Sequence, residues 1–188
     1  MKIVSFYKNE KQLIKKAVQG HRDAQERLYT TYAPKMLGVC RRYIRDLQFA
    51  EDVMVNGFVK VFQGLGSFRH QGSFEGWIRR IMVRESISYL RQQQFVVYDD
   101  TLYQKNEQTN FSDTSANLDV EYIQKLIDAL PEGYRIVFVL YAVEGYKHWE
   151  IADILGISES TSKSQLHKAR KVLQQKLKEQ NIIGYGTQ

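Results

Sequence analysis

The sequence of residues 148–170 is HWEIADILGISESTSKSQLHKAR. Its apolar residues recur at helical spacing on both sides of a central glycine, and those that would form a small core are Ile151, Leu155, Ile157 and Leu166. Gly156 stands where a tight turn needs a positive φ, and the small Ala152 lets two helices cross closely. Ser158 is placed to cap the second helix. The segment therefore predicts a helix-turn-helix over 148–155 and 159–179.

The charge of this region favours DNA as its partner. Residues 147–178 contain seven Lys or Arg and three Asp or Glu, a net charge of +4. A helix-turn-helix places its second helix in the major groove of duplex DNA. The same basic face is also compatible with a solvated surface, but the combination of motif and charge predicts DNA binding.

Helical periodicity assigns the faces of the second helix. The inward stripe consists of Leu166, Ala169, Leu173 and Leu177. Lys163, Ser164 and His167 point away from this stripe together, which makes them candidates for contacts with base edges. The candidates for phosphate contacts are Thr161, Gln165, Lys168 and Lys171.

Composition sets the class of protein. The chain has 188 residues, a formal net charge of +6, a sequence pI of about 9.3 and 43% hydrophobic residues, which fits globular domains with an acidic partner. The single cysteine, Cys40, and four scattered histidines show no metal-ligand spacing, so no metal and no cofactor are expected. Residues 1–10 lack the apolar core of a signal peptide, and the longest apolar stretch, 136–143, is too short to span a bilayer. A cytoplasmic protein without membrane insertion is predicted.

Helical patterns dominate the chain, and strand patterns are scarce. Before the helix-turn-helix, helices are predicted over about 9–19, 23–44, 48–63, 73–94, 118–129 and 132–143. Asp23 is expected to cap the second helix and Pro34 to kink it. The apolar face of the fourth is expected to hold Trp77, Ile81, Ile87 and Leu90. The predicted fold class is all-α.

A change of composition separates two domains. Residues 96–119 hold five acids and one base, Lys105, a net charge of −4, without helical periodicity. This predicts a flexible acidic linker over 96–115. The linker joins a domain over residues 1–95 to a second domain over 116–188, which contains the helix-turn-helix.

A second group of candidate residues lies around the start of the fourth helix. Residues 69–95 hold five arginines and two glutamates, a net charge of +3, and aromatic residues alternate with them. Aromatic platforms beside cations are what single-stranded nucleic acid requires. The candidates are Phe68, Arg69, His70, Gln71, Phe74, Trp77, Arg80, Arg84 and Arg91. Phe74 and Trp77 also fit a plain core role.

Three blocks of sequence resemble the extracytoplasmic-function group of the sigma-70 superfamily. They are Ala50-Glu-Asp-Val53 with Phe58 and Phe62, residues 74–79 continuing to 89–91, and Leu130-Pro131 continuing to Ala169-Arg170. Together they cover about residues 10–95 and 116–178. The resemblance implies a sigma factor whose first domain binds core RNA polymerase and captures the melted minus-ten element. Its second domain would read the minus-thirty-five element of promoter DNA.

The resemblance also implies protein partners. The third helix would dock on the clamp helices of the largest polymerase subunit, through Asp52, Val55, Asn56, Val59 and Lys60. Val55 is expected to be exposed, as an apolar residue at an interface often is. An anti-sigma factor, soluble or membrane-bound, is a further implied partner, whereas catalytic activity is not expected.

The chain departs from the family pattern at several positions. Val55-Asn56 replaces a usual Gln-Glu pair, Arg84 a usual Asn, Ser162 a usual Val and Gln165 a usual Arg. Ser162 is expected to weaken the apolar stripe, and Gln165 to remove a phosphate partner. Two alternatives stay open at this point: an ordinary helix-turn-helix regulator of duplex DNA, and a protein-binding antagonist built on a sigma-like scaffold.

Overall fold

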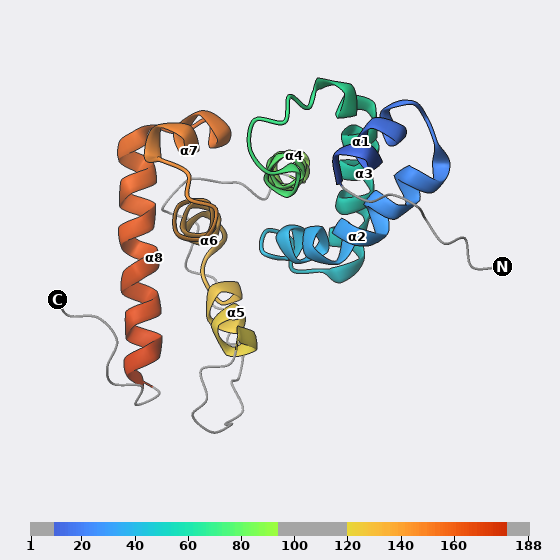
Figure 1. Cartoon of the computed structure of the whole chain (residues 1–188). Helices are drawn as coiled ribbons and strands as arrows, with labels where there is room; N and C mark the ends of the chain where they lie inside the picture. Colours follow the sequence, from blue (N-terminus) through green and yellow to red (C-terminus); the bar gives the residue numbers. More distant parts are fainter. Residues whose placement is uncertain (1–9, 94–119, 180–188) are drawn as a thin grey trace. The chain divides into compact units, whose positions relative to one another are not determined.

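The computed structural model describes residues 10–93 and 120–179, and all regular structure in these two ranges is helical (Figure 1). The chain divides into two compact units, residues 1–89 and 90–188. The all-α class is therefore confirmed. The predicted acidic linker, 96–115, lies outside the described residues, and its boundaries stay a prediction.

From residue 10 onward, where the structure describes the chain, the first unit contains four α-helices and one short 3₁₀ turn, and its last helix extends three residues past residue 89. They are α1 (Glu10–Val18), α2 (Arg22–Arg41), α3 (Leu47–Gly64), η1 (Leu65–Ser67) and α4 (Phe74–Gln92). Helix α2 packs against both α1 and α3, and η1 contacts α1 as well as α3. The loop of residues 68–73 then joins η1 to α4, so α1 lies beside the segment that leads into this loop.

The start of α2 differs from the prediction. His21 is the N-cap residue, without a side-chain hydrogen bond, and Asp23 lies inside the first turn, so the predicted Asp23 cap is wrong. An acidic residue in the first turn still interacts favourably with the helix dipole. Acidic residues are therefore common both at the cap and in the first turn, and the sequence alone does not separate the two positions. Helix α2 continues through Pro34 to Arg41. In α3, Asp46 is a true cap, because its carboxylate accepts the Phe49 N–H at 3.0 Å.

The apolar face of α4 is rotated relative to the prediction. Ile87 and Leu90 are buried as expected, but Trp77 and Ile81 are only half-buried. The buried stripe consists of Phe74, Ile78, Met82, Val83, Ile87 and Leu90. Gly57 of α3 makes room for this stripe, since a Cβ at that position would overlap the Met82 side chain.

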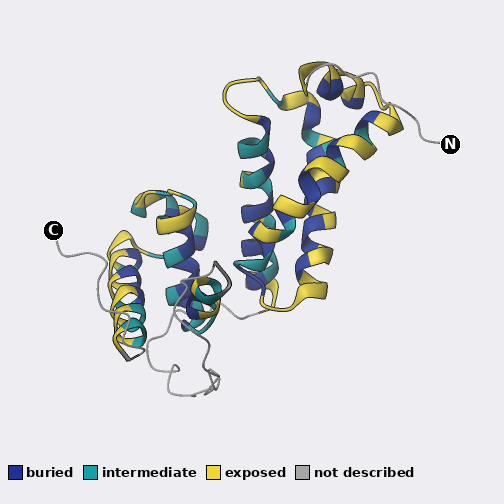
Figure 2. Cartoon of the chain, turned by 60° about the horizontal axis from the view of Figure 1, so that its bottom comes forward, coloured by how far each residue is buried: buried dark blue, intermediate teal, exposed yellow. Residues whose placement is uncertain are grey.

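The second unit is built around its last helix. Its elements are α5 (Val120–Asp128), α6 (Glu132–Phe138), η2 (Val139–Val143), α7 (His148–Leu155) and α8 (Glu159–Glu179). Helices α5, α6 and α7 all contact α8, and Figure 1 shows them along its length. Figure 2 shows α8 with buried residues along one side and exposed residues along the other.

The predicted helix over 132–143 is two elements. Pro131 is the N-cap of α6, as its position before a helical run indicated. From Val139 the backbone widens into the π-helical η2, where the Glu144 N–H donates to the Val139 carbonyl at 3.0 Å. A single π turn inside a helix is a local register shift, and such turns are common at functional sites.

The helix-turn-helix forms as the sequence predicts. Helices α7 and α8 have the predicted bounds, and Gly156 between them has a φ of +70°. The Ile157 N–H closes the turn on the Ala152 carbonyl at 3.1 Å, and Ser158 Oγ caps α8 by accepting the Thr161 N–H at 3.0 Å. These two hydrogen bonds, one between backbone groups and one to the Ser158 hydroxyl, fix the angle at which α8 leaves the turn.

Candidate nucleic-acid interfaces

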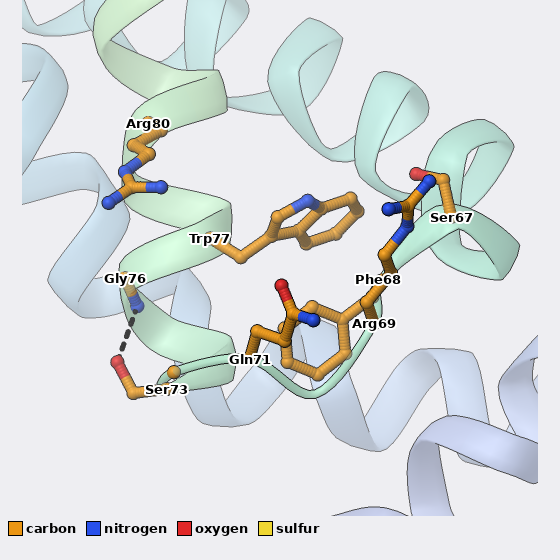
Figure 3. Close-up of a pocket in the computed structure, with 9 residues that line it drawn as sticks. Ser67, Phe68, Arg69, Gln71, Ser73, Gly76, Trp77 and Arg80 are labelled. Carbon is orange, nitrogen blue, oxygen red and sulfur yellow. Dashed lines mark hydrogen bonds between the residues drawn. The ribbon is translucent and has the colours of Figure 1, made fainter.

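The loop between η1 and α4 encloses one side of a pocket of about 290 Å³. Figure 3 shows the Trp77 indole ring in this pocket next to the Phe68 ring, with Arg80 and Arg69 to either side in that view. The lining residues are Ser67, Phe68, Arg69, Gln71, Gly72, Ser73, Gly76, Trp77 and Arg80. Five of the nine residues predicted to bind single-stranded nucleic acid thus line one cavity: Phe68, Arg69, Gln71, Trp77 and Arg80.

The loop backbone shapes the pocket. His70 has a φ of +55° and Gly72 a φ of +100°, so the chain turns sharply twice within three residues. A positive φ costs conformational energy at His70, which has a side chain. Gly72 adopts its positive φ without that cost, because it has no side chain. The His70 ring packs edge-on against Phe68, with ring centroids 4.7 Å apart.

The aromatic cluster has an open layer and a buried layer. Phe68 and Trp77 are half-buried, line the pocket and lie 5.5 Å apart between ring centroids. Phe74 lies beneath them, 5.1 Å from Phe68 and 5.8 Å from Trp77, with 1% of its surface exposed. The prediction that Phe74 contacts DNA is therefore corrected: it is a core residue on which the two pocket aromatics rest. Each such ring pair adds about 0.5–1.5 kcal/mol beyond burial.

The polar groups of the pocket are arranged around the aromatic layer. All three charged or amide side chains of the lining are exposed: Arg69 and Gln71 on the loop, and Arg80 on α4. Ser73 Oγ accepts the Gly76 N–H at 3.1 Å and so anchors the first turn of α4 (Figure 3). The cavity therefore offers hydrogen-bond donors and positive charge around an apolar surface.

Two predicted arginines lie further along α4. Arg84 is exposed one turn beyond Arg80, about 6 Å along the helix axis. Arg91 is also exposed but lies about 16 Å beyond Arg80 along the same axis, outside the pocket lining. The structure thus places Arg80 at the pocket, Arg84 one helical turn outside its lining, and Arg91 further away along the helix.

The outer face of α8 carries most of the residues predicted to contact duplex DNA. Lys163, Ser164, His167 and Lys171 are exposed on it. The Lys163 ammonium forms an exposed ion pair with Glu159 at 2.7 Å. Such surface pairs contribute little to stability, so this pair does not hold Lys163 back from another partner. Thr161 is half-buried, and its hydroxyl lies 2.8 Å from that of Ser158.

Gln165 does not belong to this face. Its side chain is 3% exposed, and its Oε1 has no hydrogen-bond partner among the described residues. The predicted phosphate contact by Gln165 is therefore corrected. Periodicity placed it on an exposed flank of α8, whereas its side chain is buried in the structure.

The structure adds Arg170, which the predicted set omitted. Arg170 is exposed, and its guanidinium lies 5.7 Å from the centre of the Tyr141 ring. On the opposite flank, the Lys168 ammonium lies 5.9 Å from the Tyr134 ring. The available signal was spacing, since Arg170 stands three residues after His167 and seven after Lys163 on the same helix.

A polar contact joins the two helices of the motif. Ser162 is fully buried, and its hydroxyl lies 2.9 Å from His148 Nδ1. The His148 ring stacks on Tyr141 at 4.6 Å. Burial lowers the pKa of His148, and the nearby Lys163 ammonium lowers it further. Ser162 therefore replaces an apolar contact with a hydrogen bond, instead of only weakening the stripe.

A third surface lies on α3. The five residues predicted to bind polymerase, Asp52, Val55, Asn56, Val59 and Lys60, are all exposed and recur at helical spacing on one face. Val55 is 46% and Val59 49% exposed, so the expected exposure of Val55 is confirmed. The Lys60 ammonium pairs with Glu85 of α4 at 2.6 Å. Leu47 and Phe49, at the start of α3, are exposed apolar residues that the prediction omitted.

Other kinds of site are scarce in what the structure describes. Within residues 10–93 and 120–179, no group of His, Cys, Asp or Glu is arranged to hold a metal ion. In the same ranges, no helix combines the length and the apolar character needed to cross a membrane. Cys40 is buried, and burial raises the pKa of its thiol to about 11.

These features define a DNA-binding protein with a helix-turn-helix in one unit and an aromatic, arginine-lined pocket in the other. The family description "Sigma-70 region 2" matches residues 28–96, and "Sigma-70, region 4" matches residues 120–173. The chain belongs to the sigma-70 family and is a sigma factor of the extracytoplasmic-function type, which directs RNA polymerase.

Individual relatives agree with this placement. The extracytoplasmic-function sigma factor SigW of Bacillus subtilis strain 168 is 27% identical over 181 residues, covering 90% of this chain and 97% of SigW. The sigma factor YlaC of the same strain is 32% identical over 157 residues, covering 80% and 90%. The sigma factor RpoE of Bartonella quintana, solved with the anti-sigma factor NepR, shares the fold with a TM-score of 0.52, 22% identity, and coverage of 81% and 96%.

Proposed function

We propose that this sigma factor divides promoter recognition between its two units. The pocket of the first unit holds an unstacked base of the melted minus-ten element, and α8 of the second unit reads the minus-thirty-five element as duplex DNA. The observation that carries the proposal is the pair of half-buried aromatics, Phe68 and Trp77, exposed to a cavity whose rim is cationic.

Energetics explain why such a pocket is needed. A protein without a source of chemical energy can only trap DNA that opens transiently, and unstacking a base costs a few kcal/mol. Stacking on an aromatic side chain returns about 1–3 kcal/mol, and arginines add attraction for the phosphates. Arg80 and Arg84, one turn apart on α4, are suited to hold the strand that leaves the pocket.

The recognition helix has a different task. Lys163, Ser164 and His167 face outward together, so they are the candidates for base edges in the major groove. Lys168, Lys171 and Thr161 lie around them and suit phosphates. Arg170 joins this second set, because its position over Tyr141 fixes a cation at the edge of the reading face.

The α3 surface is proposed to bind the clamp helices of the largest polymerase subunit. Its mixture of an acid, an amide and two exposed valines is that of a protein interface, not of a DNA-binding face. We expect Asp52→Arg to lower the affinity for core polymerase at least tenfold while the helix content stays unchanged. Core affinity equal to wild type in a titration would remove α3 from the interface.

Partners and location follow from the same role. RpoE of Bartonella quintana was solved with an anti-sigma factor, which supports a regulator of that kind, soluble or membrane-bound, for this chain. A protein that works on RNA polymerase acts in the cytoplasm, and it needs no catalytic group of its own.

Transcription with purified core polymerase tests the proposal as a whole. Core polymerase plus this chain should initiate at a defined start site on a promoter that core alone does not use. A chain that binds duplex DNA but never changes the start site would be an ordinary regulator. A chain that only reduces initiation by another sigma factor would be an antagonist.

A further inference from the structure

Helix α1 carries a row of lysines that the proposed surfaces leave unused. Lys11, Lys15 and Lys16 are exposed, while Leu13 and Ile14 on the same helix are buried. The three ammonium groups form no ion pair or hydrogen bond within residues 10–93. A helix with one apolar face and an unpaired cationic face has its charge available for an anionic partner.

Two independent contacts place α1 beside the pocket. The first is direct, because α1 packs against η1, and η1 ends at Ser67, the first residue of the pocket lining. The second passes through side chains: the Tyr32 hydroxyl donates to the Glu10 carboxylate, and the Tyr32 ring packs on Phe74 at 5.5 Å. Phe74 is the floor of the aromatic cluster, so the first turn of α1 is tied to the base of the pocket.

We propose that the lysine row of α1 binds the phosphates of the single strand whose unstacked base occupies the pocket. This inference rests on the proposed function of the pocket and extends the nucleic-acid surface beyond it. Charge complementarity and continuity with the pocket identify single-stranded DNA as the occupant. Helix α1 is about 13 Å long, enough for more than one phosphate.

The chemistry of α1 determines the kind of contact. Its exposed residues offer three ammonium groups, the Gln12 amide and the Glu10 carboxylate, but no aromatic ring on which a base could stack. Ammonium groups bind phosphate as point charges, without reading the base. The row therefore adds affinity and salt dependence but no sequence preference, which separates its effect from that of the pocket.

Salt dependence of single-strand binding is the measurement. The probe is an oligothymidylate, bound by holoenzyme made from core polymerase and the full chain, with core alone as background. The experiment compares two triple variants. One removes the charges (Lys11→Ala/Lys15→Ala/Lys16→Ala), and the other keeps them (Lys11→Arg/Lys15→Arg/Lys16→Arg). We expect the alanine variant to lower the slope of log affinity against log salt by about 2, since each single-strand phosphate contributes about 0.7. The arginine variant should keep the wild-type slope.

Two results would overturn the inference. One is an unchanged slope in the alanine variant. The other is a loss of affinity for core polymerase itself, which would make polymerase the partner of α1. The pocket is checked separately with Trp77→Ala, which should lower affinity for the oligothymidylate while leaving the slope near the wild-type value. A slope change with the lysines but no effect of Trp77→Ala would retain the α1 contact and reject base capture.

Discussion

The pocket of the first unit and the recognition face of the second unit, which we propose bind DNA in different states, are built in different ways. The recognition face is a regular helix, held by a glycine turn, a serine cap and packing against three other helices. The pocket depends on an irregular loop with two positive φ values, laid over a layer of aromatic rings. Duplex DNA has a regular shape that a regular helix matches, whereas an unstacked base needs a cavity, and a cavity needs irregular backbone.

The largest expected effect tests whether the two aromatic layers of the pocket differ. Phe74 is buried, so Phe74→Ala should lower the free energy of unfolding of the first unit by about 3–5 kcal/mol. Activity should fall equally on duplex and pre-melted templates, because the loss is one of structure. Thermal unfolding of the variant chain measures this. A near-normal melting temperature with a defect confined to duplex templates would restore Phe74 as a residue that contacts DNA.

The next effect tests the division of labour on α8. Lys163→Ala should cost about 1–3 kcal/mol of binding free energy on some minus-thirty-five sequences and relax preference at one base position. Lys168→Ala is the matched control, since it should weaken binding to all sequences alike. Affinities for a set of duplexes, each with one base pair changed, measure both. If Lys163→Ala weakens every duplex equally, it contacts phosphate and the face assignment is wrong.

The smallest effect concerns the polar contact inside the helix-turn-helix. The folded-state pKa of His148 is lowered, so the folded protein binds this proton less readily than the unfolded chain does. The second unit should therefore lose stability as the pH falls below about 6.5, the ordinary histidine value. His148→Gln should flatten this dependence between about pH 7 and pH 5. Equal pH profiles for both proteins, measured by thermal unfolding, would show that His148 is not the group responsible.

The same contrast governs what sequence could foresee. Helices α7 and α8 were predicted with their bounds, because glycine, serine and apolar spacing are local signals that agree with one another. Gln165 is misplaced because its burial depends on how the other helices pack against α8, which periodicity cannot show. The π turn at η2 was not predicted either, because no glycine, serine or change of apolar spacing marks it in the sequence.

In the first unit, composition indicated several residues that line the pocket but not how deeply each side chain is buried. Phe68, Phe74 and Trp77 were all recognised as candidates, yet which ring is buried depends on the rotation of α4 and on the left-handed φ of His70. A residue other than glycine at positive φ is rarely predictable from its type. The α1 lysines were overlooked because nothing in the sequence indicates that α1 lies beside η1.

The central claim, that the pocket holds an unstacked base, is tested most directly with Trp77→Ala. The variant is assayed by run-off transcription with core polymerase on a duplex promoter and on the same promoter with its minus-ten region already melted. Phe62→Ala, a half-buried aromatic outside the pocket, is the control. Loss of one stacking contact, about 1–3 kcal/mol, should reduce initiation on the duplex about 5- to 150-fold and leave most activity on the melted template. Equal reduction on both templates would contradict base capture by the pocket.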